Sequence, residues 1–351
     1  MKTTEEFEQL LGKVVSDLGG AANAALVIVG VRLGLFQALA EIGPATPRDL
    51  ARKTGADARC LREWLAAQAA SGYVTYDPLT ERFHLTPEQA MVFADENSPA
   101  YMAGGFFSAA SLANDERKLP EAFQSGDGIA WGDHHECLFC GTEKFFRPSY
   151  EANLVQSWIP SLDGIQARLE AGAAIADLGC GHGCSTLIMA KAFPNSQVIG
   201  FDNHAPSIAH ARRMAAEQGV ANVRFEVAAA QDFPRGDGYD LVAIFDALHD
   251  MGDPLGAARC VRAALKPGGA WMIVEPAASD RLEENLNPIG RVYYAFSAAV
   301  CVPSAQSQPG GLALGAQAGP AALERIVLDA GFGGVRVAAR SPFNLVMEAR
   351  P

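Results

Sequence analysis

The sequence predicts an α/β protein: a doubly wound, seven-stranded sheet that ends in an antiparallel strand hairpin and follows a mainly helical winged-helix domain. Three observations lead to this prediction. From residue 173 onward, short apolar runs typical of strands alternate with helical segments, which favours a parallel sheet with helices on both faces. Near the end, two apolar runs are joined by a turn that is too short for a parallel connection. The first 95 residues instead show three helices followed by a hairpin.

The first domain, residues 1–95, is recognised by its helix boundaries. An apolar helix is expected over 26–39, ended by Gly43. Thr46 is a natural N-cap for a second helix, which should stop at Gly55. A third helix starts after Asp57, with its apolar residues at helical spacing. The two short strands of the wing are expected at 73–76 and 82–85.

Residues 96–172 are interpreted as a helical linker and lid, because helical patches flank a polar, glycine-rich centre. The third part, 173–351, carries the alternating pattern. Strands are expected at 173–178, 197–201, 223–227, 239–245 and 270–275, with helices at 184–193, 205–217 and 254–265. A helix at 320–330 should lead into the closing strands, 335–340 and 343–349.

Composition and charge narrow the choice of function classes. The 351 residues are 49% hydrophobic and carry a net charge of −12. An acidic chain repels nucleic-acid phosphates, so no nucleic-acid partner is expected. The acidic N-terminus has no apolar signal core, and no run of 18 uninterrupted apolar residues is present. We therefore expect a cytoplasmic protein without membrane contact, and its seven scattered cysteines should be reduced.

A glycine-rich run lies between the first strand of the alternating region and its helix. It reads Asp177-Leu178-Gly179-Cys180-Gly181-His182-Gly183. Glycines at such a turn let the backbone approach a ligand closely. Asp202 follows the second strand, where a carboxylate can accept both hydroxyls of a ribose. The pattern predicts a nucleoside-binding site, although a tight turn without a ligand would give the same glycines.

With these residues, the segment 173–275 resembles the class I S-adenosylmethionine methyltransferases. The resemblance rests on the glycine run, Asp202, the segment 229–234 and Lys266-Pro267-Gly268-Gly269. Residues 20–90 resemble the winged-helix dimerisation domain that precedes small-molecule O-methyltransferase domains. The resemblance implies S-adenosyl-L-methionine as cosubstrate, a small-molecule acceptor that is hydrophobic, and a homodimer formed through the N-terminal domain.

The resemblance also implies roles for individual residues in binding the methyl donor. The carboxylate Asp177 opens the motif, Gly179 and Gly181 would contact the methionine portion, and Asp202 would bind the ribose. The remaining donor-binding candidates that it implies are Asn203, Gln231 and Asp232 near adenine, with Phe245 and Asp246 near the methionine amino group. Tyr150 is a further candidate from the residues alone: its hydroxyl either reaches the carboxylate of the donor, or its ring belongs to the core. Many relatives have an acid where Ala229 stands, so adenine recognition would depend on backbone, Gln231 or Asp232.

His249 is the main catalytic candidate, because it follows the fourth strand at the edge where open α/β sheets bind ligands. A hydroxyl acceptor must lose its proton during methyl transfer, and a histidine suits that task. Asp250 or a more distant acid would orient the imidazole. The alternative is that His249 only forms a hydrogen bond within its loop.

Two further stretches have readings that remain open. Cys137 and Cys140 stand beside histidines with zinc-like spacing, but nothing completes four ligands, so no metal site is expected. The aromatic residues near Tyr293 either line an acceptor pocket or belong to the core.

Two other function classes compete with the methyltransferase. A DNA-binding regulator that uses S-adenosylmethionine as a ligand would need a basic face, whereas residues 1–95 hold 9 basic and 12 acidic residues. An NAD-dependent dehydrogenase shares the first strand and turn, but its glycines are spaced differently and it has no terminal antiparallel hairpin.

Overall fold

The computed structural model describes residues 2–351. The chain forms two compact units, one of residues up to Ala113 with Glu136–Ser149, and one of Asn114–His135 with Tyr150–Pro351. The division into a first domain, a lid and a sheet domain at 95 and 172 stays a prediction.

The N-terminal unit contains the predicted winged helix. Its elements are α1 (Lys2–Arg32), α2 (Leu35–Ile42), α3 (Pro47–Thr54), α4 (Ala58–Ala70), β1 (Thr75–Asp77), β2 (Arg82–His84), α5 (Pro87–Phe93) and α6 (Gly105–Leu112). Thr46 forms a capping box with Asp49, and Gly55 takes a left-handed conformation with φ of 76°, as expected for the two ends of the second helix. Asp57 caps α4 through the amides of Arg59 and Cys60.

The single helix predicted over 26–39 is wrong. The chain breaks at Gly34, which has a left-handed φ of 62°, and divides into α1 and α2. Apolar residues occur on both sides of the break, so the hydrophobic pattern alone did not reveal it. The core of this unit lies around Phe36 and Trp64, whose rings meet edge to face at 4.9 Å.

Within the described residues, one helix segment, Thr4–Arg32, is long and apolar enough by length and composition to cross a membrane, with a mean hydropathy of 1.7. The same test is passed by core helices of soluble proteins, and 17% of the window is buried. Charges interrupt the apolar run, which is why the sequence pattern did not single it out. The expected absence of membrane contact stays a prediction.

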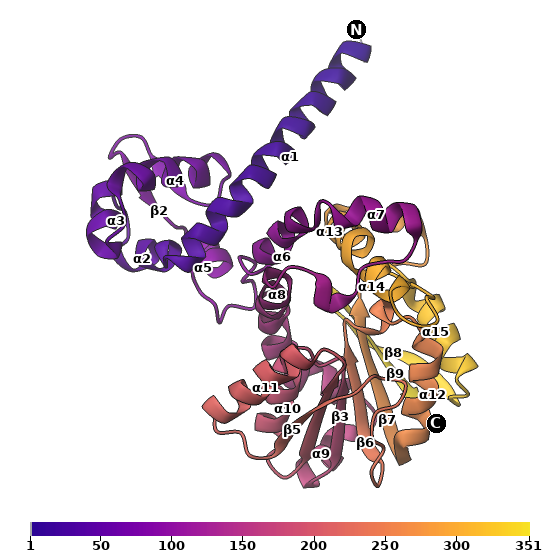
Figure 1. Ribbon diagram of the computed structural model, residues 1–351. Helices are drawn as coiled ribbons and strands as arrows, with labels where there is room; N and C mark the ends of the chain where they lie inside the picture. The colour runs from indigo at the N-terminus through magenta and orange to yellow at the C-terminus, as the bar shows by residue number, and fades with distance from the viewer. Residues whose placement is uncertain (1) are drawn as a thin grey trace. The chain divides into compact units, whose positions relative to one another are not determined.

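The C-terminal unit is built on one sheet, in which seven strands of the described chain follow the order β5-β4-β3-β6-β7-β9-β8 (Figure 1). The strands are β3 (Ala174–Leu178), β4 (Gln197–Asp202), β5 (Val223–Val227), β6 (Tyr239–Phe245), β7 (Leu265–Pro276), β8 (Gly334–Arg340) and β9 (Asn344–Arg350). The first five are parallel, whereas β9 runs antiparallel to both β7 and β8. This confirms the predicted fold class.

The helices of this unit agree with the predicted alternation. They are α7 (Lys118–Ser125), α9 (Ile165–Ala171), α10 (Cys184–Ala192), α11 (Ala205–Glu217), α12 (Pro254–Ala264), α13 (Pro288–Phe296), α14 (Val302–Gln306) and α15 (Gly319–Asp329). Helix α8 (Cys137–Asn153) runs across the boundary of the two units. The strand expected at 270–275 begins earlier, at Leu265, and continues through the Pro267-Gly268-Gly269 stretch.

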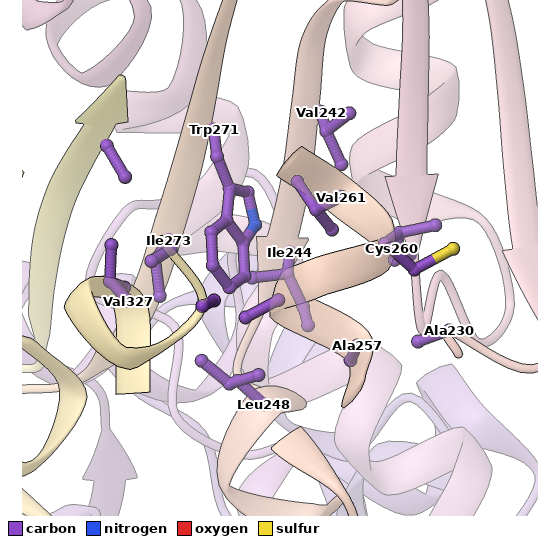
Figure 2. Close-up of a cluster of buried hydrophobic side chains, with 14 of the residues drawn as sticks. Ala230, Val242, Ile244, Leu248, Ala257, Cys260, Val261, Trp271, Ile273 and Val327 are labelled. Carbon is purple, nitrogen blue, oxygen red and sulfur yellow. The ribbon is translucent and has the colours of Figure 1, made fainter. Parts of the chain in front are cut away.

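The core of the C-terminal unit lies between the sheet and the α12–α15 pair. Trp271 of β7 is fully buried among Val261 of α12, Val327 of α15 and Ile273 (Figure 2). Leu248, which directly follows the loop after β6, also inserts into this cluster and is fully buried. The core therefore anchors the loop that carries His249.

Candidate functional site

The glycine run forms the turn from β3 to α10, at the point where the strand order reverses between β3 and β6. Gly179, Gly181 and Gly183 all have positive φ, at 68°, 52° and 82°. A Cβ on Gly179 would meet the methyl group of Ala247 at 2.9 Å, and one on Gly183 would meet the ring of Phe225 at 2.7 Å. A Cβ on Gly181 would meet nothing within 4 Å. The turn is therefore packed at its ends and open at its middle.

Asp202 at the end of β4 lies directly beside this turn. Its Oδ2 accepts the Gly181 amide at 2.8 Å, and its Oδ1 accepts the His204 amide at 2.8 Å. Burial raises the pKa of the Asp202 carboxyl, although the two amides counteract that effect. The predicted ribose-binding acid and the predicted glycine turn are thus joined by a hydrogen bond.

Asp177 occupies a different place, beneath the turn. The side chain is fully buried, and its Oδ2 accepts the hydroxyls of Ser185 at 2.7 Å and Thr186 at 2.6 Å. Its Oδ1 is buried and has no hydrogen-bond partner among the described residues. Burial raises the pKa of this carboxyl to about 7. Asp177 therefore links β3 to the first turn of α10 through Oδ2, whereas its Oδ1 stays available for a hydrogen-bond donor.

Asp246 follows β6 and has a φ of 48°, a left-handed conformation that is uncommon outside glycine. Its Oδ2 accepts the Tyr150 hydroxyl at 2.8 Å, and the Asn344 amide donates to its Oδ1 at 3.1 Å. Burial and the nearby charge of Glu275 raise the pKa of Asp246 to about 7. Phe245 is buried, with its ring centroid 5.3 Å from that of Tyr150. In this structure the Tyr150 hydroxyl is engaged by Asp246.

His249 lies on a short 3-10 turn after β6, with 3% of its surface exposed. Its Nδ1 bonds to Oε2 of Glu275, and the other carboxylate oxygen of Glu275 accepts the Leu248 amide at 2.9 Å. On the opposite side of the ring, Nε2 lies 3.1 Å from Oδ1 of Asp250. Burial alone would lower the pKa of His249, but the charges of Glu275 and Asp250 outweigh it and raise that pKa well above 6.5.

The residues expected near adenine lie along the same edge but with fewer contacts. Asn203 is exposed directly after Asp202, and Asp232 is also exposed. Gln231 is half-buried, and its amide nitrogen lies 3.4 Å from the carbonyl oxygen of Asp253. The structure thus brings these three residues to the carboxyl-terminal edge of the sheet.

Two residues of this site were missed by the sequence interpretation, Glu275 and Asn344. Glu275 is the penultimate residue of β7, and a buried acid at a strand end could have been noticed there. Asn344 starts β9, and its register opposite Pro276 brings it to Asp246. No local signal in the sequence links position 344 to position 246.

The remaining candidate stretches contribute in other ways. Cys137 and Cys140 lie in the first turn of α8 and are not joined in a disulfide. His134 bonds through Nδ1 to Asp115 at 2.7 Å. The hydroxyl of Tyr293, in α13, donates to the carbonyl oxygen of Phe343 at 3.0 Å. Tyr293 is buried, which raises the pKa of its hydroxyl.

Comparison with family models finds two matches along the chain. Residues 169–308 match the model described as a methyltransferase domain, and residues 21–94 match the Rv2258c-like winged HTH domain. The first match covers the parallel part of the predicted sheet domain, and the second lies within the predicted winged-helix domain.

Curated relatives align with parts of the chain. Trans-aconitate 2-methyltransferase of Variovorax paradoxus is 34% identical over 31% of this chain and 40% of its own length. The ubiquinone biosynthesis O-methyltransferase of Ralstonia nicotianae is 32% identical over 35% of this chain and 50% of its own. Acetylserotonin O-methyltransferase of Mus musculus is 28% identical over 76% of this chain and 73% of its own. The chain spans half or less of the length of the first two.

Solved structures share the whole architecture at low identity. A putative O-methyltransferase from Nostoc punctiforme superposes with a TM-score of 0.72 at 19% identity, covering 96% of this chain and 98% of the other. Human N-acetylserotonin methyltransferase, solved in complex with SAM, gives 0.68 at 17% identity, with 97% of each chain covered. These similarities establish the fold.

Proposed function

We propose that this chain, which joins a winged helix-turn-helix domain to a methyltransferase domain, is an S-adenosylmethionine-dependent methyltransferase that acts on a small, hydrophobic molecule, with oxygen as the methylated atom. The observation that carries the proposal is the hydrogen bond that the Gly181 amide donates to Asp202, at a glycine where a Cβ would meet no atom within 4 Å. It supports the proposal because a carboxylate that could accept the hydroxyls of a ribose lies against a backbone that a ligand can approach, within a matched methyltransferase domain.

The residues present fit S-adenosylmethionine. Space beside Gly181 allows close approach, and the buried Oδ1 of Asp177 and Oδ1 of Asn344 each lack a hydrogen-bond partner among the described residues. An unsatisfied buried acceptor is costly unless a ligand supplies a donor. The donor's amino group offers such hydrogens, and Asp246 adds a carboxylate nearby. When bound, the cosubstrate supplies an electrophilic methyl group on a sulfonium.

The protein's part in the reaction is to orient the groups and to move a proton. Asp202, with Asn203, Gln231 and Asp232 further along the edge, would hold the nucleoside. Alignment and exclusion of water are the main aids to an in-line displacement. The neutral form of His249 would accept the proton of an acceptor hydroxyl at Nε2, and Glu275 at Nδ1 would fix the ring and stabilise the imidazolium that results. Asp250 would share this orienting role.

We also propose that the protein is a cytoplasmic homodimer joined through its N-terminal unit. A row of exposed apolar side chains on α1 supports this, because such rows commonly mark protein interfaces. The row consists of Phe7, Leu10, Leu11, Val14, Val15 and Leu18. On α4, by contrast, Arg59 pairs with Glu63, and Arg62 is balanced by Asp57 at the N-cap, so residues 57–72 carry no net charge, whereas DNA-binding helices usually show a basic face.

Calorimetry tests the cosubstrate directly. S-adenosylhomocysteine, the product of the donor, should bind at about one molecule per chain, whereas NAD should give no heat of binding. Transfer of labelled methyl groups to a panel of phenols and hydroxylated heterocycles then identifies the acceptor class. Tight binding of NAD without S-adenosylhomocysteine would refute the proposal.

A further inference from the structure

The buried cluster around His249 contains three different metal-ligating atoms. One ring nitrogen of His249, a carboxylate oxygen of Asp250 and Cys301 Sγ all lie within 4.8 Å of one another. His249 and Asp250 come from the turn after β6, whereas Cys301 comes from a π-helical turn, Ser297–Cys301, between α13 and α14. Such π-turns are rare and occur frequently at functional sites.

The separation of two of these atoms suits a tetrahedral zinc ion. Zinc bonds to imidazole and carboxylate are about 2.0–2.2 Å long, which separates two ligand atoms by about 3.3 Å at a tetrahedral angle. His249 Nε2 and Asp250 Oδ1 are 3.1 Å apart. That Oδ1 is buried and has no hydrogen-bond partner in the part of the chain that the structure describes. The two atoms thus lie at ion-pair distance, close to the separation that two ligands of one zinc ion require.

The groups behind the cluster also resemble a metal site. Histidine ligands nearly always donate their second ring N–H to a carboxylate or carbonyl, which fixes the ring and raises its basicity. Glu275 bonds to His249 Nδ1 in this way and is itself held by the Leu248 amide. Cys301 is 7% exposed, so little competing water reaches its sulfur. Imidazole, carboxylate and thiolate together favour zinc over magnesium or calcium.

We propose that His249 Nε2, Asp250 and Cys301 Sγ form a zinc-binding site with a fourth position left for water or another ligand. Binding displaces a proton from the imidazole and one from the thiol, so the affinity should rise with pH. A zinc ion on Nε2 occupies the atom that would accept the substrate proton. Zinc would therefore inhibit methyl transfer. This inhibition rests on the proposed function, whereas the binding of zinc does not depend on it.

Cobalt(II) substitution is the sharpest test, because a thiolate ligand gives an intense near-ultraviolet band that free or carboxylate-bound cobalt lacks. The full-length protein should take up about one zinc ion per chain and show this band with cobalt(II). Cys301→Ser should lose the band and bind zinc at least about tenfold more weakly. Cys260→Ser is the matched control, because Cys260 is also buried, at 4% exposed, but lies in α12; it should keep the band.

Asp250→Asn provides a second variant in case Cys301→Ser does not fold. It should also weaken zinc binding by at least about tenfold at an unchanged unfolding midpoint. The inference is overturned if the wild type shows no thiolate band. It is also overturned if Cys301→Ser keeps the band, because other thiols such as Cys137 and Cys140 would then hold the metal. S-adenosylhomocysteine binding, measured on the same samples, separates the two proposals. If S-adenosylhomocysteine binds normally but the cobalt band is missing, only the zinc site is refuted. If S-adenosylhomocysteine does not bind, the methyltransferase proposal is refuted.

Discussion

Three aspartates at the carboxyl-terminal edge of the sheet owe their behaviour to burial. Asp177, Asp202 and Asp246 all have pKa values raised by desolvation, the first and last to about 7. Each is nevertheless held by hydrogen-bond donors, which favour the charged form. Such carboxyls gain most from a ligand that brings positive charge or N–H groups, and an S-adenosylmethionine molecule has both.

Asp202→Ala should weaken binding of S-adenosylhomocysteine by about 10- to 100-fold, the usual loss for hydrogen bonds to a charged group. The variant also releases the Gly181 amide, so the turn loses a second contact. Calorimetry measures the affinity, and Asp237→Ala, at an exposed position, is the control. An unchanged affinity in Asp202→Ala would contradict the ribose assignment.

The buried Asp177 makes the stability of the unliganded protein depend on pH. Its folded pKa of about 7 lies above the ordinary value of 3.8, so the folded state binds more protons than the unfolded state between these values. The free energy of unfolding must then fall as pH rises from about 4 to 7. Over about three pH units the contribution of this one group reaches at most about 4 kcal/mol.

Asp177→Asn removes that contribution, because its amide does not titrate. The difference in unfolding free energy between variant and wild type, measured by urea unfolding, should therefore shift in favour of the variant as pH rises from 4 to 7. Asp237→Asn, which is exposed, should show a difference that does not vary with pH. A flat difference for Asp177→Asn would mean that its carboxyl is not desolvated.

His249→Ala should lower kcat by about 10²- to 10⁴-fold, the range for loss of an acid–base group, and leave S-adenosylhomocysteine affinity unchanged. Glu275→Gln keeps the shape of the side chain but removes the charge that orients Nδ1. It should lower kcat by a smaller factor with little change in KM for the donor. Full activity in both variants would show that methyl transfer needs no base from this cluster.

The strand pattern of the sequence points to the candidate site residues that follow strands, and it gives no signal for those that come from distant segments. Asp202, Asp246 and His249 each stand at a strand end, where the alternating pattern identifies the ligand-binding edge. Asn344 reaches Asp246 only because β9 pairs antiparallel with β7 in one register. Cys301 reaches His249 through a π-helical turn, and neither arrangement has a local pattern.

At the scale of elements, caps were more predictable than breaks within apolar segments. Thr46 and Gly55 mark both ends of α3 as their residue types suggest. Gly34 divides an apolar stretch whose periodicity continues on both sides, and helices α13 and α14 form in a region where the sequence pattern predicted no helix. Tertiary packing determines where helices form and break in such segments, because the local helix propensities are weak.

The exposed leucines of helix α1 lead to a prediction about dimer formation. Leu11 and Leu18 are 51% and 66% exposed, so burying them against a second chain would stabilise a dimer. Leu11→Glu with Leu18→Glu would place charges in that interface and should raise the dimer dissociation constant by at least about 30-fold. Light scattering with sedimentation measures it, and Glu8→Gln on the same helix is the control. A wild-type protein that is monomeric at high concentration would refute the dimer.

At the scale of the whole molecule, the chain contains two compact units with separate hydrophobic cores. The cofactor candidates Asp177, Asp202 and Asp246 all belong to the C-terminal unit. A ligand stabilises only what it binds in its folded form. The two units should therefore respond differently to the donor, and a single two-state unfolding transition is not expected.

Hydrogen exchange resolved along the chain tests this difference. S-adenosylhomocysteine at about 100 times its dissociation constant should stabilise the C-terminal unit by about 2.7 kcal/mol. Amides of β3, β4 and α10 that exchange through unfolding of that unit should then slow by about 100-fold, whereas those of α3 and α4 should not change. In Asp202→Ala at the same ligand concentration, the exchange of these amides should slow by a smaller factor, because a smaller fraction of the variant binds the ligand. Equal protection of both units would instead mean that they unfold together, so that the ligand stabilises the whole chain through one cooperative transition.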